Sequence, residues 1–320
     1  MGERIGRGEA PAKAILLGEH AVVYGYPAIA VPLPQLRARA EAHFDSSLDD
    51  LVIESVGKGR AVSLRRDPGQ PLALAAALAM QALEATPTNL RLRLESNIPI
   101  ASGLGSGAAV STAIMRALAN LLGKALAAEQ LSALVYEVEK LHHGTPSGID
   151  NTVVVYGKPV YFRKGEAPEF LSLAYPLLLL LADTGEASLT REAVANLRQA
   201  REDNPEQVNT LLGRVGALVE DGRRALLEGN LPALGQVLTA NHSILANLGV
   251  SSASLDRLVG AAGAAGALGA KMTGAGRGGH AIALVTADTA QRVGMALQAA
   301  GAKRVTLCAV ECRSQERICT

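Results

Sequence analysis

Hydrophobic and polar positions follow two periodicities along the chain, and together they predict a mixture of strands and helices. Short apolar or alternating runs bounded by glycine and polar residues are typical of strands. Runs of this kind occupy residues 14–17, 28–31, 37–44, 51–53, 90–95, 177–182, 280–285 and 304–310. Residues 151–162 have the pattern of a hairpin turning at Gly157-Lys158.

Longer Ala- and Leu-rich segments predict helices. They cover residues 71–85, 108–122, 127–141, 189–199, 207–228, 231–248, 254–265 and 289–300, the last with Asp288 as a candidate N-cap. Strands and helices intermingle in the first half, whereas long helices dominate after residues 163–175. We therefore expect two domains, residues 1–165 and 166–320.

Composition narrows the class of protein. The chain has 320 residues, of which 48% are hydrophobic, enough for a substantial buried core. Lys plus Arg number 31 against 30 Asp plus Glu, so no overall field attracts nucleic acid or an acidic membrane. Aromatic residues make up 3%, which argues against stacking platforms for single-stranded nucleic acid. We expect neither nucleic acid nor a membrane as partner.

The lack of a visible targeting segment and the pattern of cysteines indicate a cytoplasmic protein. No apolar run approaches the roughly 20 residues that span a bilayer. The three cysteines, Cys308, Cys312 and Cys319, lie in the last strand region and the tail. Their odd number, with no visible signal peptide, predicts reduced and inert thiols in a cytoplasmic protein.

Residues 99–109 (PIASGLGSGAA), the first glycine loop, join a predicted strand to a predicted helix. Glycines let successive backbone N–H groups face one concavity, and a helix N-terminus favours an anion such as phosphate. A dinucleotide fingerprint fails, because Glu129 at the required distance lies within a predicted helix. A Walker A loop fails because no Lys-Ser/Thr pair follows. A tight turn without a ligand remains the alternative.

Residues 271–280 (KMTGAGRGGH), the second glycine loop, precede a strand rather than a helix. This context provides no helix dipole for a pyrophosphate, so the loop is not a dinucleotide site. Small residues here allow a ligand or another segment to lie close to the backbone. Two such loops in one chain favour an enzyme that handles phosphate.

Five ionisable residues are candidates for chemistry. Lys13 begins an apolar strand, and Glu19-His20 follow a glycine turn. Asp150 lies in a turn shaped by Gly and Pro that can direct its carboxylate into a pocket. Glu139 lies near a helix C-terminus, where an anion is disfavoured unless a cation such as Mg²⁺ compensates. The alternatives are a snorkelling Lys13, an exposed Glu19-His20 pair and a solvated Glu139 paired with Lys140 or His143.

Three segments together resemble the signature motifs of the GHMP kinases. They are residues 11–25 (PAKAILLGEHAVVYG), 99–109 and 271–284, in the family's order. Residues 143–151 (HGTPSGIDN) resemble the family segment that carries the catalytic aspartate in members that phosphorylate mevalonate. Residues 182–191 also resemble the family's stretch after the domain junction.

The resemblance implies an α+β fold with two domains. The N-terminal domain would be of the ribosomal-protein type, the C-terminal domain ferredoxin-like, and the active site would lie in the cleft between them. The implied reaction is ATP-dependent phosphorylation of the C5 hydroxyl of mevalonate by a homodimer that uses Mg²⁺. Other small-molecule kinases of this family, acting on phosphomevalonate or a sugar, and a non-catalytic nucleotide sensor are the alternatives.

The resemblance also implies a role for each matching residue. Asp150 would be the catalytic carboxylate, and Lys13 its cationic neighbour would stabilise developing charge. Glu139 and Ser106 would hold Mg²⁺. The residues implied for ATP are Pro99, Ser102, Gly103, Leu104, Gly105, Ser106, Gly107 and Ala108. Those implied for the acceptor are Glu19, His20, Thr190, Gly274 and Ala275.

The chain departs from the family pattern at three positions. Gly107 replaces a serine in the phosphate loop, so Ser106, Ser111 or a water would have to supply the missing hydroxyl. Arg277 replaces a glycine, and could reach a phosphate or point to solvent. His280 replaces a cysteine.

Overall fold

The computed structural model describes residues 4–57, 59, 61–99, 102–143, 146–187 and 190–311. These form two compact units assembled from separate segments of the chain. Unit 1 contains Met1–Lys13, Pro34–Ile100 and Gly105–Gly157, and unit 2 contains Ala14–Leu33, Ala101–Leu104 and Lys158–Thr320. The strands β1 (Gly6–Leu17) and β2 (Ala28–Phe44) pair with each other, and each contributes to both units.

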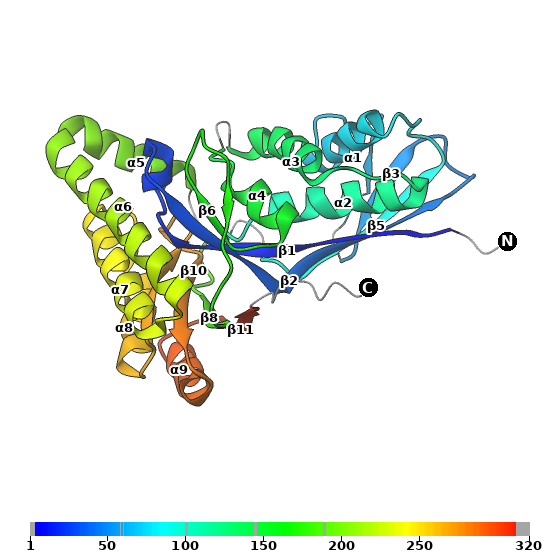
Figure 1. The fold of residues 1–320 in the computed structure, drawn as a ribbon. Coiled ribbons are helices and arrows are strands. Elements are labelled where there is room, and N and C mark those ends of the chain that lie inside the picture. The colour runs from blue at the N-terminus through cyan, green and yellow to red at the C-terminus, as the bar shows by residue number, and fades with distance from the viewer. Residues whose placement is uncertain are drawn as a thin grey trace, which may run out of the picture. The chain divides into compact units, whose positions relative to one another are not determined.

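Unit 1 is a sheet with helices packed on one another beside it (Figure 1). The strands follow the order β4-β3-β5-β2, where β3 is Leu51–Ser55, β4 Val62–Ser63 and β5 Leu90–Ser96. β5 is antiparallel to β2 and parallel to β3. The helices are α1 (Pro71–Ala82), α2 (Ser106–Leu122), α3 (Ala128–His143) and α4 (Ile149–Tyr156).

A close approach of backbone to backbone fixes β1 against α2. A Cβ added to Gly6 or Gly8 would come within 2.2 Å of the carbonyl oxygens of Ala117 and Ala113. Only glycine fits at that separation. β1 is therefore held against α2, and it carries Lys13 in the same unit.

Unit 2 contains a four-stranded antiparallel sheet in the order β11-β8-β10-β9. The strands are β8 (Leu177–Asp183), β9 (Gly269–Thr273), β10 (His280–Val285) and β11 (Arg304–Val310). With helices between the first and second strands and between the third and fourth, this is the ferredoxin-like order. The expected fold of the C-terminal half is confirmed.

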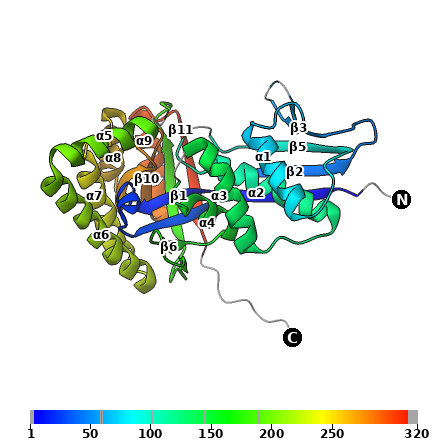
Figure 2. The same cartoon turned by 90° about the horizontal axis from the view of Figure 1, so that it is seen from above.

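Long helices contribute most of the remaining core of unit 2. They are α5 (Thr190–Asp203), α6 (Pro205–Glu228), α7 (Leu231–Asn247), α8 (Ala253–Ala264) and α9 (Ala287–Ala299). In Figure 2, α6, α7 and α8 run side by side, and α7 and α8 both contact β9. Smaller elements are the 3-10 turn η1 (Ala21–Tyr24) and the strands β6 (Val160–Phe162) and β7 (Glu169–Phe170).

The hairpin expected over residues 151–162 is wrong. Residues Ile149–Tyr156 form the helix α4, and only β6 is a strand. The β-branched run Val153–Val155 has strand propensity, but these side chains are buried on a short helix whose ends are both left-handed glycines, Gly148 and Gly157. Tertiary burial outweighed local propensity here.

Three boundaries also differ from the expectations. α2 begins at Ser106, two residues before the predicted start, so Ser106 and Gly107 lie in its first turn. The runs 28–31 and 37–44 are one strand, β2, which continues through Pro32 and Pro34. The N-cap of α9 is Thr286, whose capping box with Thr289 replaces the predicted Asp288.

Two other expectations concern the thiols and the membrane. Cys308 is buried, and burial raises its thiol pKa to about 11, so it is inert at neutral pH, as expected. Cys312 and Cys319 lie outside the described residues. Across the described part of the chain, no helix combines the length and apolar character needed to cross a bilayer.

Candidate active site

The central feature of unit 1 is an ion pair between Lys13 and Asp150. The Lys13 ammonium on β1 lies 3.1 Å from Asp150 Oδ1. Asp150 is in the first turn of α4, where the helix dipole favours a carboxylate. Lys13 is 3% exposed and Asp150 is 25% exposed, so the cation is enclosed while the carboxylate can still be reached. The alternative of a snorkelling Lys13 is wrong.

The N-terminal end of α2 lies against the same lysine. Gly105 is the N-cap of α2 in a left-handed conformation, and a Cβ there would meet Lys13 Cγ at 3.0 Å. Ser106, Gly107 and Ala108 follow as the first turn of a 17-residue helix. The first N–H groups of an α-helix have no partner within the helix, so this turn has the geometry expected of an anion site, and phosphate binding here stays a prediction.

Glu139 is buried in unit 1, at 2% exposure on α3. Burial, and after it the nearby Asp150 carboxylate, raise the pKa of the Glu139 carboxyl, Lys13 opposes them, and the result is a pKa of about 8. The alternative of a solvated Glu139 is therefore wrong. A carboxylate in this environment is costly until a cation is bound beside it.

The donor set of unit 1 fits Mg²⁺ rather than a protein-only metal cage. Among the described residues, no three His, Cys, Asp or Glu side chains gather as a metal cluster. Mg²⁺ usually takes one or two carboxylates and completes its shell with water and substrate phosphates. The buried Glu139 carboxylate is a ligand of this kind, and Ser106 as its partner stays a prediction.

In unit 2, the two glycine loops touch each other. Gly103 and Gly274 both have positive φ, and a Cβ on Gly103 would come within 3.3 Å of the Gly274 Cα. Ser102 and Leu104 beside them are buried. The middle of the first glycine loop is thus packed on the second, which limits how residues 102–104 can move. Of the remaining loop residues, Pro99 is half-buried in unit 1, whereas Ile100 and Ala101 lie outside the described residues.

Glu19 and His20 are buried in unit 2, at 1% and 7% exposure, which excludes an exposed pair. Glu19 forms an ion pair with Lys271 of β9, and its second oxygen accepts a 3.3 Å hydrogen bond from Asn241. His20 Nε2 lies 2.9 Å from the carbonyl oxygen of Ala275. Burial lowers the pKa of His20 to about 4, so the imidazole is neutral at physiological pH.

Sequence reasoning gave Lys271 no role. Its side chain is fully buried, and its ammonium also donates to the Met272 carbonyl. Burial lowers its pKa, and Glu19 opposes this shift. The available signal was a lysine inside the apolar strand β9, the same signal that singled out Lys13.

His280 and Asp183 are paired residues on β10 and β8, and His280 Nε2 lies 3.9 Å from Asp183 Oδ2. The pKa of His280 is lowered by burial, opposed by Asp183 and by a hydrogen bond to the backbone of Ser102. His280 therefore links β10 to the first glycine loop.

Thr190 begins α5, and its side chain lies outside the described residues. Gly144 and Thr145, in the segment that leads to Asp150, also lie outside them.

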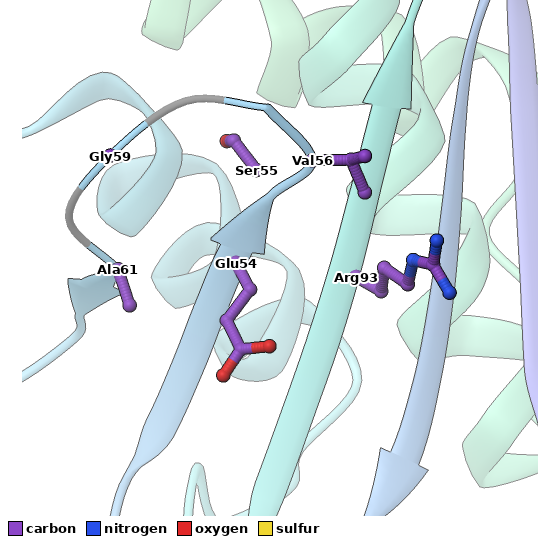
Figure 3. A pocket seen from close by; sticks show the side chains of 6 residues that line it. All are labelled: Glu54, Ser55, Val56, Gly59, Ala61 and Arg93. Atoms are coloured by element: carbon purple, nitrogen blue, oxygen red, sulfur yellow. The ribbon is translucent and has the colours of Figure 1, made fainter.

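A separate open hollow in unit 1 contains none of the predicted residues (Figure 3). It is lined by Glu54, Ser55, Val56, Gly59, Ala61 and Arg93. Glu54 pairs with Arg91, and Arg93 pairs with Glu95 at 2.9 Å. Both are surface ion pairs, so we assign no chemistry to this hollow.

Comparison with known proteins agrees with these motifs. The profile of the GHMP kinases N terminal domain matches residues 71–158, and that of the GHMP kinases C terminal domain matches residues 223–303. Mevalonate kinase of Pyrococcus horikoshii is 36% identical over 295 residues, covering 86% of this chain and 87% of the relative. Mevalonate kinase of Thermococcus sibiricus is 37% identical over 316 residues, covering 91% and 92%.

Solved structures show the same relationship. L. major mevalonate kinase, solved in complex with R-mevalonate, has a TM-score of 0.83 at 28% identity and covers 98% of this chain and 97% of its own. Methanococcus jannaschii mevalonate kinase has a TM-score of 0.82 at 25% identity, covering 96% and 98%. The chain therefore belongs to the mevalonate kinases of the GHMP kinase family.

Proposed function

We propose that this protein transfers the γ-phosphoryl group of ATP to the C5 hydroxyl of mevalonate. The observation that carries the assignment of roles is the Lys13–Asp150 pair, with an enclosed cation and an accessible carboxylate 3.1 Å away. A protein that only binds nucleotide has no need of such a pair. Family membership supplies the acceptor class.

In the proposed step, the Asp150 carboxylate accepts the proton of the C5 hydroxyl as that oxygen bonds to the γ-phosphorus. The bond between the γ-phosphorus and the β,γ-bridging oxygen breaks, and ADP leaves with the electron pair. Lys13 keeps the carboxylate in place and offsets the negative charge that develops near it. Phosphoryl transfer depends mainly on alignment and charge neutralisation, so these two side chains and the loop suffice on the protein side.

We further propose that Mg²⁺ is the cofactor, held by Glu139 and Ser106 together with oxygens of ATP. The metal neutralises phosphate charge when bound. Glu139 is suited to this role because burial makes its anion costly in the absence of a cation. The backbone N–H groups of Ser106, Gly107 and Ala108 at the start of α2 then face the phosphates.

For the acceptor, we propose that His20, Thr190, Gly274 and Ala275 contact mevalonate. Glu19 acts through the Lys271 pair that holds the turn before His20 in place. We also propose that the protein is a homodimer in the cytoplasm. We place the boundary between its two domains near residue 165. The subunit number can be checked by analytical ultracentrifugation of the purified protein.

A coupled assay of ADP release tests the function. Purified protein is given MgATP with mevalonate, phosphomevalonate or galactose in parallel. We expect release that depends on mevalonate, with at most a few per cent of that rate for the other two. Release with phosphomevalonate or galactose alone would move the protein to another branch of the family. No release with any acceptor, despite nucleotide binding, would support a sensor.

A further inference from the structure

Arg277 stands in the second glycine loop with a backbone that usually requires glycine. Its φ is +53°, and its neighbours Gly276 and Gly278 also have positive φ. A side chain is disfavoured in this conformation relative to glycine. Such strain persists where the surrounding contacts hold it.

Those contacts come from the guanidinium group and the backbone of Arg277. In the amide orientation that satisfies both groups, the Asn196 side-chain oxygen on α5 accepts from Nη1 at 3.1 Å and Nη2 at 3.2 Å. Nη2 also lies 3.4 Å from the Gly249 carbonyl oxygen, and the Arg277 N–H donates to Val250 at 3.0 Å. Arg277 thus ties the loop both to α5 and to the turn between α7 and α8, and neither solvent nor a phosphate is needed to explain it.

Two residues earlier, the same loop contacts the imidazole of His20. The Ala275 carbonyl oxygen lies 2.9 Å from His20 Nε2. A carbonyl can only accept, so the proton of the neutral ring is on Nε2, and Nδ1 keeps a lone pair that can accept from a ligand hydroxyl. His20 itself has φ +61°, so two strained non-glycine residues are linked through Ala275.

We infer that Arg277 is a positioning residue that holds the Ala275 carbonyl where it fixes the tautomer of His20. The inference rests on the proposed function, in which His20 contacts the hydroxylated acceptor. Because Arg277 acts on binding geometry in unit 2 and not on Lys13 or Asp150, it sets acceptor affinity more than turnover.

Three substitutions at Arg277 separate its roles. Arg277→Ala removes the guanidinium and keeps the strained backbone, Arg277→Gly removes both, and Arg277→Lys keeps the charge without the two-pronged contact to Asn196. We expect the KM for mevalonate to rise about five- to tenfold in all three, with kcat and the KM for ATP within about twofold of wild type. Asn196→Ala is expected to give about half of the loss in binding free energy, a two- to threefold rise in KM.

The second readout is the tautomer of His20. ¹⁵N-histidine NMR of the full-length protein near pH 8 reports which ring nitrogen carries the proton, and the missing signal in His20→Asn assigns it. Wild type is expected to show protonated Nε2, and Arg277→Ala a mixture of tautomers. The control is Arg198→Ala, an exposed arginine on α5 paired with Glu202, which is expected to change neither the KM nor the spectrum.

An unchanged KM for mevalonate together with an unchanged His20 signal in Arg277→Ala would overturn the inference. So would a rise in KM in Arg277→Ala that Arg277→Gly abolishes, since that result would assign the effect to strain. If wild type itself shows no mevalonate-dependent ADP release, the proposed function fails. The NMR comparison still tests the link from Arg277 to His20 in that case.

Discussion

Among the described residues, Lys13 and Lys271 are both buried and both pair with a carboxylate, and the two pairs differ in whether that carboxylate can be reached. In unit 1, Lys13 is enclosed, but Asp150 keeps 25% of its side chain exposed. In unit 2, the side chains of Lys271 and Glu19 are both fully buried. Both lysines come from strands, β1 and β9, whose other side chains are mostly apolar.

The difference separates chemistry from anchoring. An accessible carboxylate can take a proton from a substrate, whereas a pair closed on both sides can only hold its two segments together. Closing a pair in this way is costly, because both ions lose their water, and here Asn241 and the Met272 carbonyl supply further polar contacts. The variants below test this division, beginning with the largest expected effect.

Asp150→Asn should abolish most turnover. The amide has the same shape but cannot take the proton, so kcat should fall by about 10²- to 10⁴-fold while MgATP still binds. Steady-state kinetics and nucleotide titration measure the two quantities. A kcat near that of wild type would remove Asp150 from the mechanism. The Lys13–Asp150 pair would then have no catalytic role to separate it from the Lys271–Glu19 pair.

Lys271→Met should instead act on stability. Removing one partner leaves the Glu19 carboxylate buried and uncompensated, which costs about 3–5 kcal/mol of unfolding free energy. Urea denaturation measures it. The matched variant Lys13→Met should lose less stability, because the exposed face of Asp150 can be hydrated, yet it should lose activity as Asp150→Asn does. Equal losses of stability in the two variants would contradict the comparison.

Glu139→Gln should change how stability depends on pH in the metal-free protein. The carboxyl keeps its proton up to about pH 8 in the folded state but loses it near 4.5 when unfolded, so wild type loses stability as the pH rises between these values. The slope is at most about 1.4 kcal/mol per pH unit. The variant should lack this contribution when unfolding is followed in EDTA. An identical pH profile would place Glu139 in a wetter environment.

The same variant tests the metal. A neutral amide is a weaker ligand than a carboxylate, so the Mg²⁺ concentration at half-maximal rate should rise several-fold in Glu139→Gln. Titration of Mg²⁺ at constant ATP measures it, with Glu137→Gln on the exposed face of α3 as the control. An unchanged titration would leave Glu139 outside the metal shell.

Gly107→Ser should have the smallest effect. Gly107 is the second residue of α2, where the backbone is helical, so a serine meets no φ strain. If a metal-ligating hydroxyl is what the loop lacks, the KM for MgATP should stay the same or fall slightly. A tenfold rise in the KM for ATP with unchanged Mg²⁺ dependence would instead mean that a Cβ crowds the phosphates.

Much of the fold could be predicted from local pattern. The long helices α6, α7 and α8 lie within a few residues of their expected ranges, because their periodicity extends over several turns. Residues 151–156 were expected as the first strand of a hairpin because the β-branched run Val153–Val155 favours a strand, but they belong to the helix α4. Burial between left-handed glycine caps decided its conformation, and no local rule encodes that.

For the candidate site, the sequence by itself determined which residues have chemistry to offer. Lys13, Glu19, His20 and Asp150 were candidates because of their charge beside apolar or glycine-rich runs, and Glu139 because it lies near a helix C-terminus. The resemblance to the GHMP kinases then implied a role for each. Only the tertiary structure decided their partners. In the structure Lys13 pairs with Asp150, and Lys271 pairs with Glu19, which lies 252 positions away in the chain. Glu139 is buried. The physical reason is that desolvation and ion pairing depend on distance in space, which a sequence pattern does not contain.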